Sequence, residues 1–116
     1  MSGSHKVLVY GTLKKGYGNN YLLGTSPMIR DGSFAIPNHR LIDSGLPFLV
    51  KSSKTSAFFG EVYEVDDEVL ASLDALELHP TWYKRTFFKE IDASVYVLQD
   101  KVSEDIPTIF SYGSDR

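Results

Sequence analysis

The chain contains no cysteine among its 116 residues. This absence excludes a disulfide framework, a thiolate metal site and a thiol nucleophile. The sequence also lacks a run of about 18 apolar residues, and its first residues do not combine a basic segment with an apolar one. We therefore expect neither a membrane span nor a signal peptide, and we expect a cytoplasmic protein.

The chain has no large excess of charge of one sign. The net charge is −3, and the 12 Lys and Arg residues are scattered along the sequence instead of forming a basic stripe. Such a chain exerts no long-range attraction on nucleic acid. We expect no nucleic-acid partner, and composition alone does not specify the oligomeric state.

The chain does contain enough apolar material for one folded domain. Hydrophobic residues make up 42% of the sequence and aromatic residues 13%, which is too much for an intrinsically disordered chain. Residues 1–5, Met-Ser-Gly-Ser-His, read like an expression scar and are left out of the expected fold. We expect a single domain over residues 6–116.

Short β-branched and aromatic runs, separated by glycine, proline and asparagine, predict a chain dominated by strands. Strands are expected at residues 6–10, 57–65, 86–91 and 94–98, and as shorter pieces within 28–50 that break at 31–32, 37–38 and 44–45. A helical turn is expected near 21–23 and one longer helix near 67–77, capped by Asp66 or Asp67. Residues 101–116 read as a polar tail with an apolar patch at 106–110. The predicted class is α+β, a small mixed β-sheet or barrel flanked by one or two helices.

One carboxylate of the predicted helix lies on the helix face that should be buried. At about 100° per residue, Val69, Leu70, Leu73 and Leu76 share a stripe that should be buried, and Glu77 falls inside that stripe. Burial raises the pKa of a carboxyl group toward the range that is useful for proton transfer. The alternative is a frayed last helical residue, exposed to solvent or paired with a nearby basic side chain.

The loop after the first strand is the second candidate. Gly11 and Gly16 bracket a turn whose backbone N–H groups would converge on a carboxylate or an oxyanion. A nucleotide-binding P-loop is excluded, because Tyr17 and Gly18 stand where Lys and Ser or Thr are required. The alternative is a solvated connection that binds no ligand.

Three blocks of the sequence together resemble the γ-glutamyl cyclotransferase-like family. The first is a Tyr-Gly-(Thr/Ser)-Leu-(Lys/Arg) motif at the end of the first strand, followed by an Asn, and the second is a Gly-Glu-(Val/Leu)-Tyr strand. The third is Leu-Asp-x-x-Glu with Tyr-x-Arg six and eight residues after the Glu. In this chain these blocks are residues 10–14 with Asn19, residues 60–63, and Leu73, Asp74, Glu77, Tyr83 and Arg85. Pro80, three residues after the Glu, makes the third block most similar to the γ-glutamylamine cyclotransferase (AIG2-like) branch.

The resemblance implies a compact β-barrel with flanking helices and an enzyme that needs no cofactor or metal. Its substrate would be a small γ-glutamyl amine or γ-glutamyl amino acid, which is cyclised to 5-oxoproline with release of the free amine. Glu77 stands in the place of the family's catalytic acid/base. Tyr10, Gly11, Thr12, Leu13 and Tyr83 are the expected substrate-binding residues, with Lys14, Asn19 and Arg85 as further candidates.

Other interpretations of the same residues stay open at this point. Tyr10 and Tyr83 are also ordinary aromatic core residues, Arg85 is also suited to a structural salt bridge, and His79 reads as a loop histidine. The same pocket would serve a binding module that holds a small ligand without turning it over, or it would be vestigial in a structural protein. A cavity that joins Glu77 to the 11–13 amides is what cyclisation requires.

Overall fold

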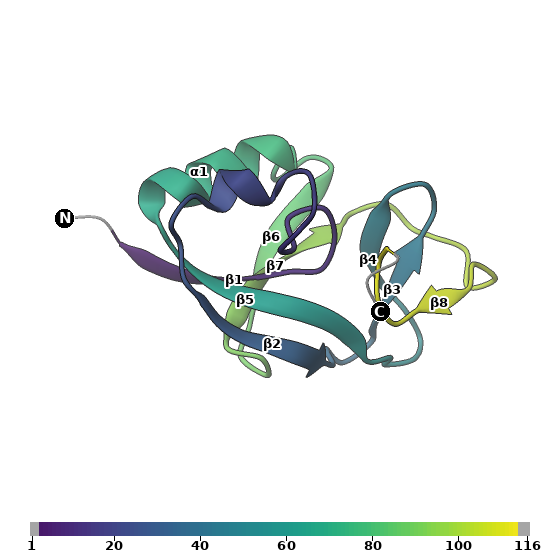
Figure 1. The fold of residues 1–116 in the computed structure, drawn as a ribbon. Coiled ribbons are helices and arrows are strands. Elements are labelled where there is room, and N and C mark those ends of the chain that lie inside the picture. The colour runs from purple at the N-terminus through teal and green to yellow at the C-terminus, as the bar shows by residue number, and fades with distance from the viewer. Residues whose placement is uncertain (1–2, 114–116) are drawn as a thin grey trace.

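The structure is a computed structural model, and it describes residues 3–113 (Figure 1). Strands hold more of these residues than helices do, as the short β-branched runs predict. Eight strands, one α-helix and one 3₁₀ helix follow one another along the chain: β1 (Ser4–Val9), η1 (Asn20–Leu23), β2 (Met28–Phe34), β3 (His39–Asp43), β4 (Pro47–Lys51), β5 (Phe58–Asp66), α1 (Asp67–Leu76), β6 (Tyr83–Phe88), β7 (Ala93–Leu98) and β8 (Thr108–Ile109).

The strands form two sheets, one large and one small. The large sheet has five strands in the order β2-β5-β1-β7-β6, and the small sheet has three in the order β4-β3-β8. Strand β1 runs parallel to β7 and antiparallel to β5. In Figure 1, α1 and η1 lie over one face of the large sheet, and the small sheet stands at its end. Among the described residues neither sheet closes on itself, so the α+β class is confirmed and the closed barrel implied by the resemblance is wrong.

The second half of the central strand β1, residues 7–9, is apolar on both faces, because both faces are covered there. Its side chains alternate, as those of a strand must. Val7 and Val9 join the cluster that contains Leu70 and Leu73 of α1, whereas Leu8 joins the cluster on the opposite side. A strand buried on both faces reads as a continuous apolar run. The buried position of β1 carries its last residue, and the loop that follows, into the interior.

The element boundaries differ from the sequence prediction at several points. Strand β1 begins at Ser4, so Ser4 and His5 pair with β5 and belong to the fold. Strand β2 runs through the predicted break at 31–32, since Gly32 takes a φ of 131° within the strand. Strand β6 begins at Tyr83, three residues earlier than predicted, and residues 89–92 form a turn. The apolar patch of the tail contains the short strand β8, which the sequence did not predict.

The helix α1 begins and ends on recognisable capping interactions. The Asp66 side chain accepts a hydrogen bond of 2.8 Å from the amide of Val69, which is a helix N-cap. At the other end the amides of Leu78 and His79 donate to the carbonyls of Ala75 and Asp74, with Leu78 at a φ of 53°. This is a Schellman motif. It ends the helix at Leu76 and fixes Glu77 as the residue at its C-cap.

With ten residues, α1 is the longest helix in residues 3–113, and none there is long and apolar enough to cross a membrane.

Candidate active site

The loop that follows β1 is folded back on itself. The amide of Lys14 donates to the Gly11 carbonyl at 3.0 Å, and the amide of Asn19 donates to the Thr12 carbonyl at 3.0 Å. The Asn19 side chain adds a second bond, from its Nδ2 to the Thr12 hydroxyl at 2.9 Å. Gly11 is required here because a Cβ at this position would lie 2.4 Å from Cγ of Pro47. Asn19 therefore holds Thr12, and Pro47 packs directly against the turn.

The amides of Gly11, Thr12 and Leu13 have no hydrogen-bond acceptor in the part of the chain that the structure describes. Within residues 3–113, none of these three N–H groups donates a hydrogen bond to another protein atom. Gly11 and Leu13 are buried, and Thr12 is partly buried. Buried backbone N–H groups are nearly always paired, so three unpaired ones in sequence point to a ligand that accepts hydrogen bonds. This loop is suited to a carboxylate or to an oxygen that gains negative charge during a reaction.

Glu77 faces this loop from the end of α1. Its backbone is held by a hydrogen bond of 3.0 Å to the Leu73 carbonyl, and its half-buried side chain projects into the interior. Burial raises the pKa of Glu77 from 4.5 to about 7. No side chain among the described residues donates a hydrogen bond or forms an ion pair with this carboxylate. Glu77 is therefore an unpaired carboxyl group that exchanges a proton near neutral pH.

An ion pair fixes the end of the helix on the large sheet. Arg85 of β6 donates two hydrogen bonds to the Asp74 carboxylate, at 2.9 and 3.0 Å, and the Tyr96 hydroxyl donates a third at 2.7 Å. Burial alone would raise the pKa of Asp74, but the bonds from Arg85 and Tyr96 outweigh it and hold that pKa below its usual range. The Arg85 amide also donates to Nδ1 of His79. This network anchors the turn of α1 that precedes Glu77.

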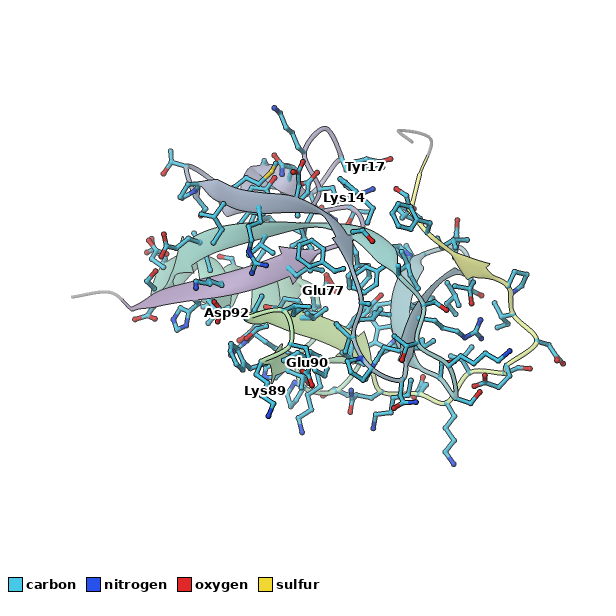
Figure 2. All side chains as sticks on the ribbon, turned by 90° about the horizontal axis from the view of Figure 1, so that it is seen from below. Lys14, Tyr17, Glu77, Lys89, Glu90 and Asp92 are labelled. Atoms are coloured by element: carbon cyan, nitrogen blue, oxygen red, sulfur yellow. The ribbon has the colours of Figure 1, made fainter. Side chains whose placement is uncertain are left out.

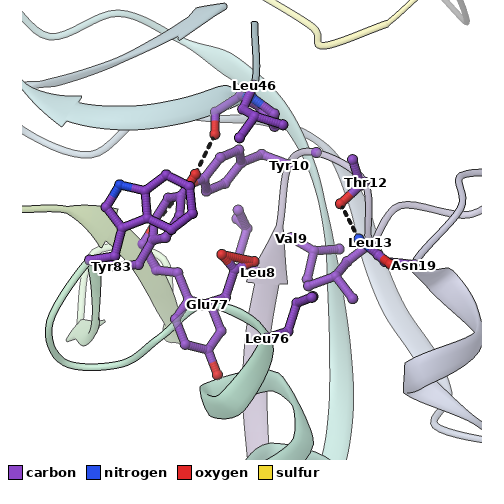
Figure 3. A pocket seen from close by; sticks show the side chains of 14 residues that line it. Leu8, Val9, Tyr10, Thr12, Leu13, Asn19, Leu46, Leu76, Glu77 and Tyr83 are labelled. Atoms are coloured by element: carbon purple, nitrogen blue, oxygen red, sulfur yellow. Dashed lines mark hydrogen bonds between the residues drawn. The ribbon is translucent and has the colours of Figure 1, made fainter. Parts of the chain in front are cut away.

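A cavity of about 180 Å³ lies between Glu77 and the loop. Its floor is built from buried side chains of β1, β7 and the loop. Figure 3 shows the Glu77 carboxylate in the middle of this space, with Tyr10 and Leu46 on one side and Thr12, Leu13 and Asn19 on another. The lining residues are Leu8, Val9, Tyr10, Gly11, Thr12, Leu13, Asn19, Leu46, Pro47, Leu76, Glu77, Trp82, Tyr83 and Tyr96.

The two predicted tyrosines contribute walls to the cavity. The Tyr10 hydroxyl donates to the Tyr96 carbonyl at 2.6 Å, and the Tyr83 hydroxyl donates to the Pro47 carbonyl at 2.9 Å. Burial raises the pKa of both hydroxyls above the usual value for tyrosine, and the neighbouring Glu77 adds to this effect. The Tyr83 ring stacks on Phe48 at a centroid distance of 5.9 Å. Both tyrosines stay neutral and already have partners, so they shape the cavity instead of moving protons.

Two further candidates lie outside the cavity lining. Lys14 is fully buried, but its ammonium donates to the Tyr112 carbonyl at 2.8 Å and sits over the rings of Tyr17 and Phe59. Figure 2 shows Lys14 and Tyr17 beside the C-terminal segment. Arg85 is occupied by Asp74. The structure thus brings together Glu77, residues 10–13, Asn19 and Tyr83, and it places Lys14 and Arg85 in supporting contacts.

Several residues that line the cavity were not among the predicted site residues. Leu76 was expected in the buried stripe of the helix, but it is 36% exposed and borders the opening. Leu46, Trp82 and Tyr96 come from three different segments and carry no local signal for a site. Pro47 lies in a segment with a strong apolar signal, but only the contact with Gly11 shows its role. Within the described chain, no group of three or more His, Asp or Glu side chains is placed to hold a metal ion.

Comparisons with known proteins identify the family of the chain. Residues 7–114 match the sequence model of the family described as "Gamma-glutamyl cyclotransferase, AIG2-like". A putative gamma-glutamylcyclotransferase of Methanocaldococcus jannaschii is 37% identical over 98 residues, which are 78% of this chain and 81% of that protein. Gamma-glutamylaminecyclotransferase B of Danio rerio is 35% identical over 91 residues, which are 72% of this chain and 48% of that protein.

A solved structure shows the same fold. The crystal structure of an AIG2-like protein from Mus musculus superimposes with a TM-score of 0.74 at 26% sequence identity, covering 97% of this chain and 90% of that one. The family match spans both halves of the cavity, from the loop after β1 to Glu77 and Tyr83. The chain therefore belongs to the gamma-glutamyl cyclotransferase, AIG2-like family of enzymes.

Proposed function

We propose that this chain cyclises a γ-glutamyl amine or γ-glutamyl amino acid to 5-oxoproline and releases the free amine, with Glu77 as the general acid/base. The observation that carries this proposal is the cavity that joins an unpaired carboxyl group to three unpaired backbone amides. Cyclisation within the substrate needs a proton acceptor and a site for negative charge, and it needs no nucleophile from the protein. This cavity offers both the proton acceptor and the site for negative charge.

The size of the cavity suits the glutamyl part of such a substrate. A space of about 180 Å³ holds a folded five-carbon acid, and it lies between the loop and the helix end. Folding the glutamyl chain brings its α-nitrogen to its γ-carbonyl carbon, and a buried site that enforces this conformer removes much of the entropy cost of ring closure. Val9, Tyr10 and Tyr83 form neutral walls of this space.

Glu77 would take part in both halves of the reaction. As a carboxylate it accepts a proton from the α-ammonium, and the resulting amine forms the new bond to the γ-carbonyl carbon. As a carboxylic acid it then protonates the leaving nitrogen, and the old carbon–nitrogen bond breaks. The α-nitrogen loses two protons in all and the leaving nitrogen gains two, so protons balance when the amine departs as an ammonium ion. A pKa of about 7 makes both forms available near neutral pH.

The amides of residues 11–13 would stabilise negative charge. They face either the substrate carboxylate or the oxygen of the tetrahedral intermediate, and in both cases the charge receives hydrogen bonds from donors that are already in place. Asn19 supports this loop by its two hydrogen bonds to Thr12. Removing one such donor typically lowers the rate by about 10²-fold or more.

Product analysis tests this proposal. The protein is incubated with γ-glutamyl-isopropylamine, and 5-oxoproline, free amine and glutamate are measured by mass spectrometry. Equal amounts of 5-oxoproline and amine are expected. The N-acetyl derivative of the same compound is the matched control, because its nitrogen cannot attack and no product should form. Release of glutamate would indicate a hydrolase instead, and binding without any product would indicate a binding module.

A further inference from the structure

A second cavity, of about 420 Å³, lies at the small sheet and shares no lining residue with the cavity beside Glu77. It is bordered by β3, by the connection between β4 and β5, and by the segment that leads into β8. Most of its side chains can donate hydrogen bonds, so this cavity is suited to a polar ligand. The lining residues are Arg40, Ser52, Ser53, Lys54, Ser56, Glu104, Asp105, Ile106, Pro107 and Thr108.

A buried guanidinium group lines this second cavity. Arg40 is only 4% exposed, and all its hydrogen bonds go to neutral oxygens. The Ile106 carbonyl and the Thr108 hydroxyl accept from Nη1, and the Ser103 carbonyl accepts from Nη2 at 3.0 Å. No carboxylate within residues 3–113 forms an ion pair with Arg40. A charge that is taken out of water is costly unless an opposite charge compensates it.

One edge of this guanidinium group is not fully paired. The Nε atom of Arg40 is buried and has no hydrogen-bond partner among the described residues. Nη2 can donate two hydrogen bonds, and it donates one. Nε and Nη2 share one edge of the planar group, and such an edge binds two oxygens of a phosphate or a carboxylate. Because buried donors are nearly always paired, this edge points to an anionic ligand.

The connection between β4 and β5 brings further donors to the same cavity. The hydroxyls of Ser52 and Ser53 donate to one carboxylate oxygen of Glu104, at 3.4 and 3.2 Å, so they already serve a negatively charged oxygen. Lys54 is exposed at the same cavity and adds a positive charge. Glu104 is also exposed, so its side chain can turn into water when a ligand takes its place. The connection therefore offers hydroxyl groups and an ammonium group to an anion that enters.

We propose that this second cavity binds a phosphate group, with the Nε–Nη2 edge of Arg40 and the hydroxyls of Ser52 and Ser53 as donors and Lys54 as a second cation. A phosphate group suits the cavity better than a carboxylate, because it has more oxygens and carries up to two negative charges. Glu104 competes with the ligand for the two hydroxyls. The proposal does not depend on the cyclisation, since the two cavities have no residue in common.

Titration of the isotope-labelled chain with inorganic phosphate tests the proposal. Amide chemical shifts are followed by NMR at constant pH, and sodium chloride at the same ionic strength is the matched control. We expect saturable changes at residues 52–56 with phosphate and none with chloride. Equal changes with chloride, changes that do not saturate, or saturable changes confined to residues 11–13 overturn the proposal. Methyl phosphate is titrated in the same way: tighter binding than that of inorganic phosphate supports a phosphomonoester as the ligand, and weaker binding supports the free anion.

Substitution of Arg40 tests the assigned donor. Arg40→Lys keeps the positive charge but loses the two-pronged edge, so the affinity for phosphate should fall about tenfold or more. Arg40 also holds the segment before β8, so circular dichroism is used to check that the variant is folded. An unchanged affinity in the folded variant overturns the proposal.

Two exposed residues keep the proposal testable even if Arg40→Lys does not fold. Lys54→Ala should weaken phosphate binding about two- to fivefold, whereas Lys51→Ala, which removes an exposed lysine outside the cavity, should leave it unchanged. Glu104→Gln should tighten binding by a similar factor, because a competing negative charge is lost. Equal effects of the two lysine substitutions, or weaker binding in Glu104→Gln, contradict the assignment of the site.

Discussion

Replacing Glu77 by glutamine should make the protein more stable at neutral and alkaline pH. Glutamine has nearly the same shape, but it cannot ionise. In the folded protein, burial raises the pKa of Glu77 from 4.5 to about 7. Between these two values the folded state binds more protons at this site than the unfolded state does. The free energy of unfolding of the parent protein therefore falls as the pH rises through this window, and the glutamine variant lacks this loss.

The size of the effect follows from the two pKa values. Their difference, about 7 minus 4.5, corresponds to about 3 kcal/mol in the free energy of unfolding when Glu77 has its ordinary pKa of 4.5 in the unfolded chain. Glu77 is only half-buried, since the cavity opens to solvent beside Leu76, so we expect about 2 to 3 kcal/mol at pH values above about 8 and almost no difference below about 4.5. Urea unfolding at several pH values measures this difference directly.

A matched control separates burial from the simple loss of a negative charge. Glu90→Gln removes the same charge from an exposed residue in the turn between β6 and β7. We expect its stability to stay within about 0.5 kcal/mol of the parent protein at every pH. If Glu77→Gln shows the same small and pH-independent difference as Glu90→Gln, the carboxyl group of Glu77 is not desolvated and our interpretation of the site is refuted.

Three further substitutions test the parts that surround Glu77. Leu78→Gly should stabilise the protein by about 1 kcal/mol in thermal unfolding, because Leu78 has a φ of 53° that glycine adopts more easily; a loss of stability would contradict the role of the Schellman motif. Gly11→Ala should lower kcat by about 10²-fold, because the new Cβ would lie 2.4 Å from Pro47 and would displace the amides; unchanged kcat would mean that the loop does not bind the reacting group. Asp74→Asn should cost roughly 2 kcal/mol at pH 7 by breaking the pair with Arg85; this cost should begin to shrink as the pH falls below about 4, where the unfolded chain takes up a proton at Asp74, and should vanish only below the lowered pKa of the folded carboxyl group, and a cost that does not change with pH would contradict the ion pair.

The sequence predicted the parts of the fold that depend on local patterns. The helix follows from an N-cap aspartate and a stripe of leucines, and the structure confirms it within one residue. A glycine inside a strand is typical of a bulge or a close approach, and at Gly60 a Cβ would lie 2.9 Å from the Leu8 side chain. The strand break expected at 31–32 is absent, because glycine can continue a strand when its partner strand supplies the hydrogen bonds. The parallel pairing of β1 with β7 joins residues far apart in the sequence, and no local pattern indicates it.

The candidate site was predictable where its residues lie in one segment. Residues 10–13 follow a buried strand, and Glu77 interrupts an apolar helix face, so both stand out in the sequence. Leu46, Trp82 and Tyr96 reach the cavity through the packing of the small sheet, the β6 connection and β7, and this packing is set by tertiary contacts. Arg85 is a residue that the sequence identified without showing which residue it contacts. Its spacing from Glu77 is a motif, but only the structure shows that it bonds Asp74.

The central claim is that Glu77 moves the protons of the cyclisation, and one comparison tests it most directly. The rate of 5-oxoproline release from γ-glutamyl-isopropylamine is measured for the parent protein and for Glu77→Gln, and calorimetry measures the affinity of each for the same substrate. We predict that kcat falls by about 10²- to 10⁴-fold in the variant while affinity changes by less than about tenfold. A variant that keeps the parent kcat would contradict the account.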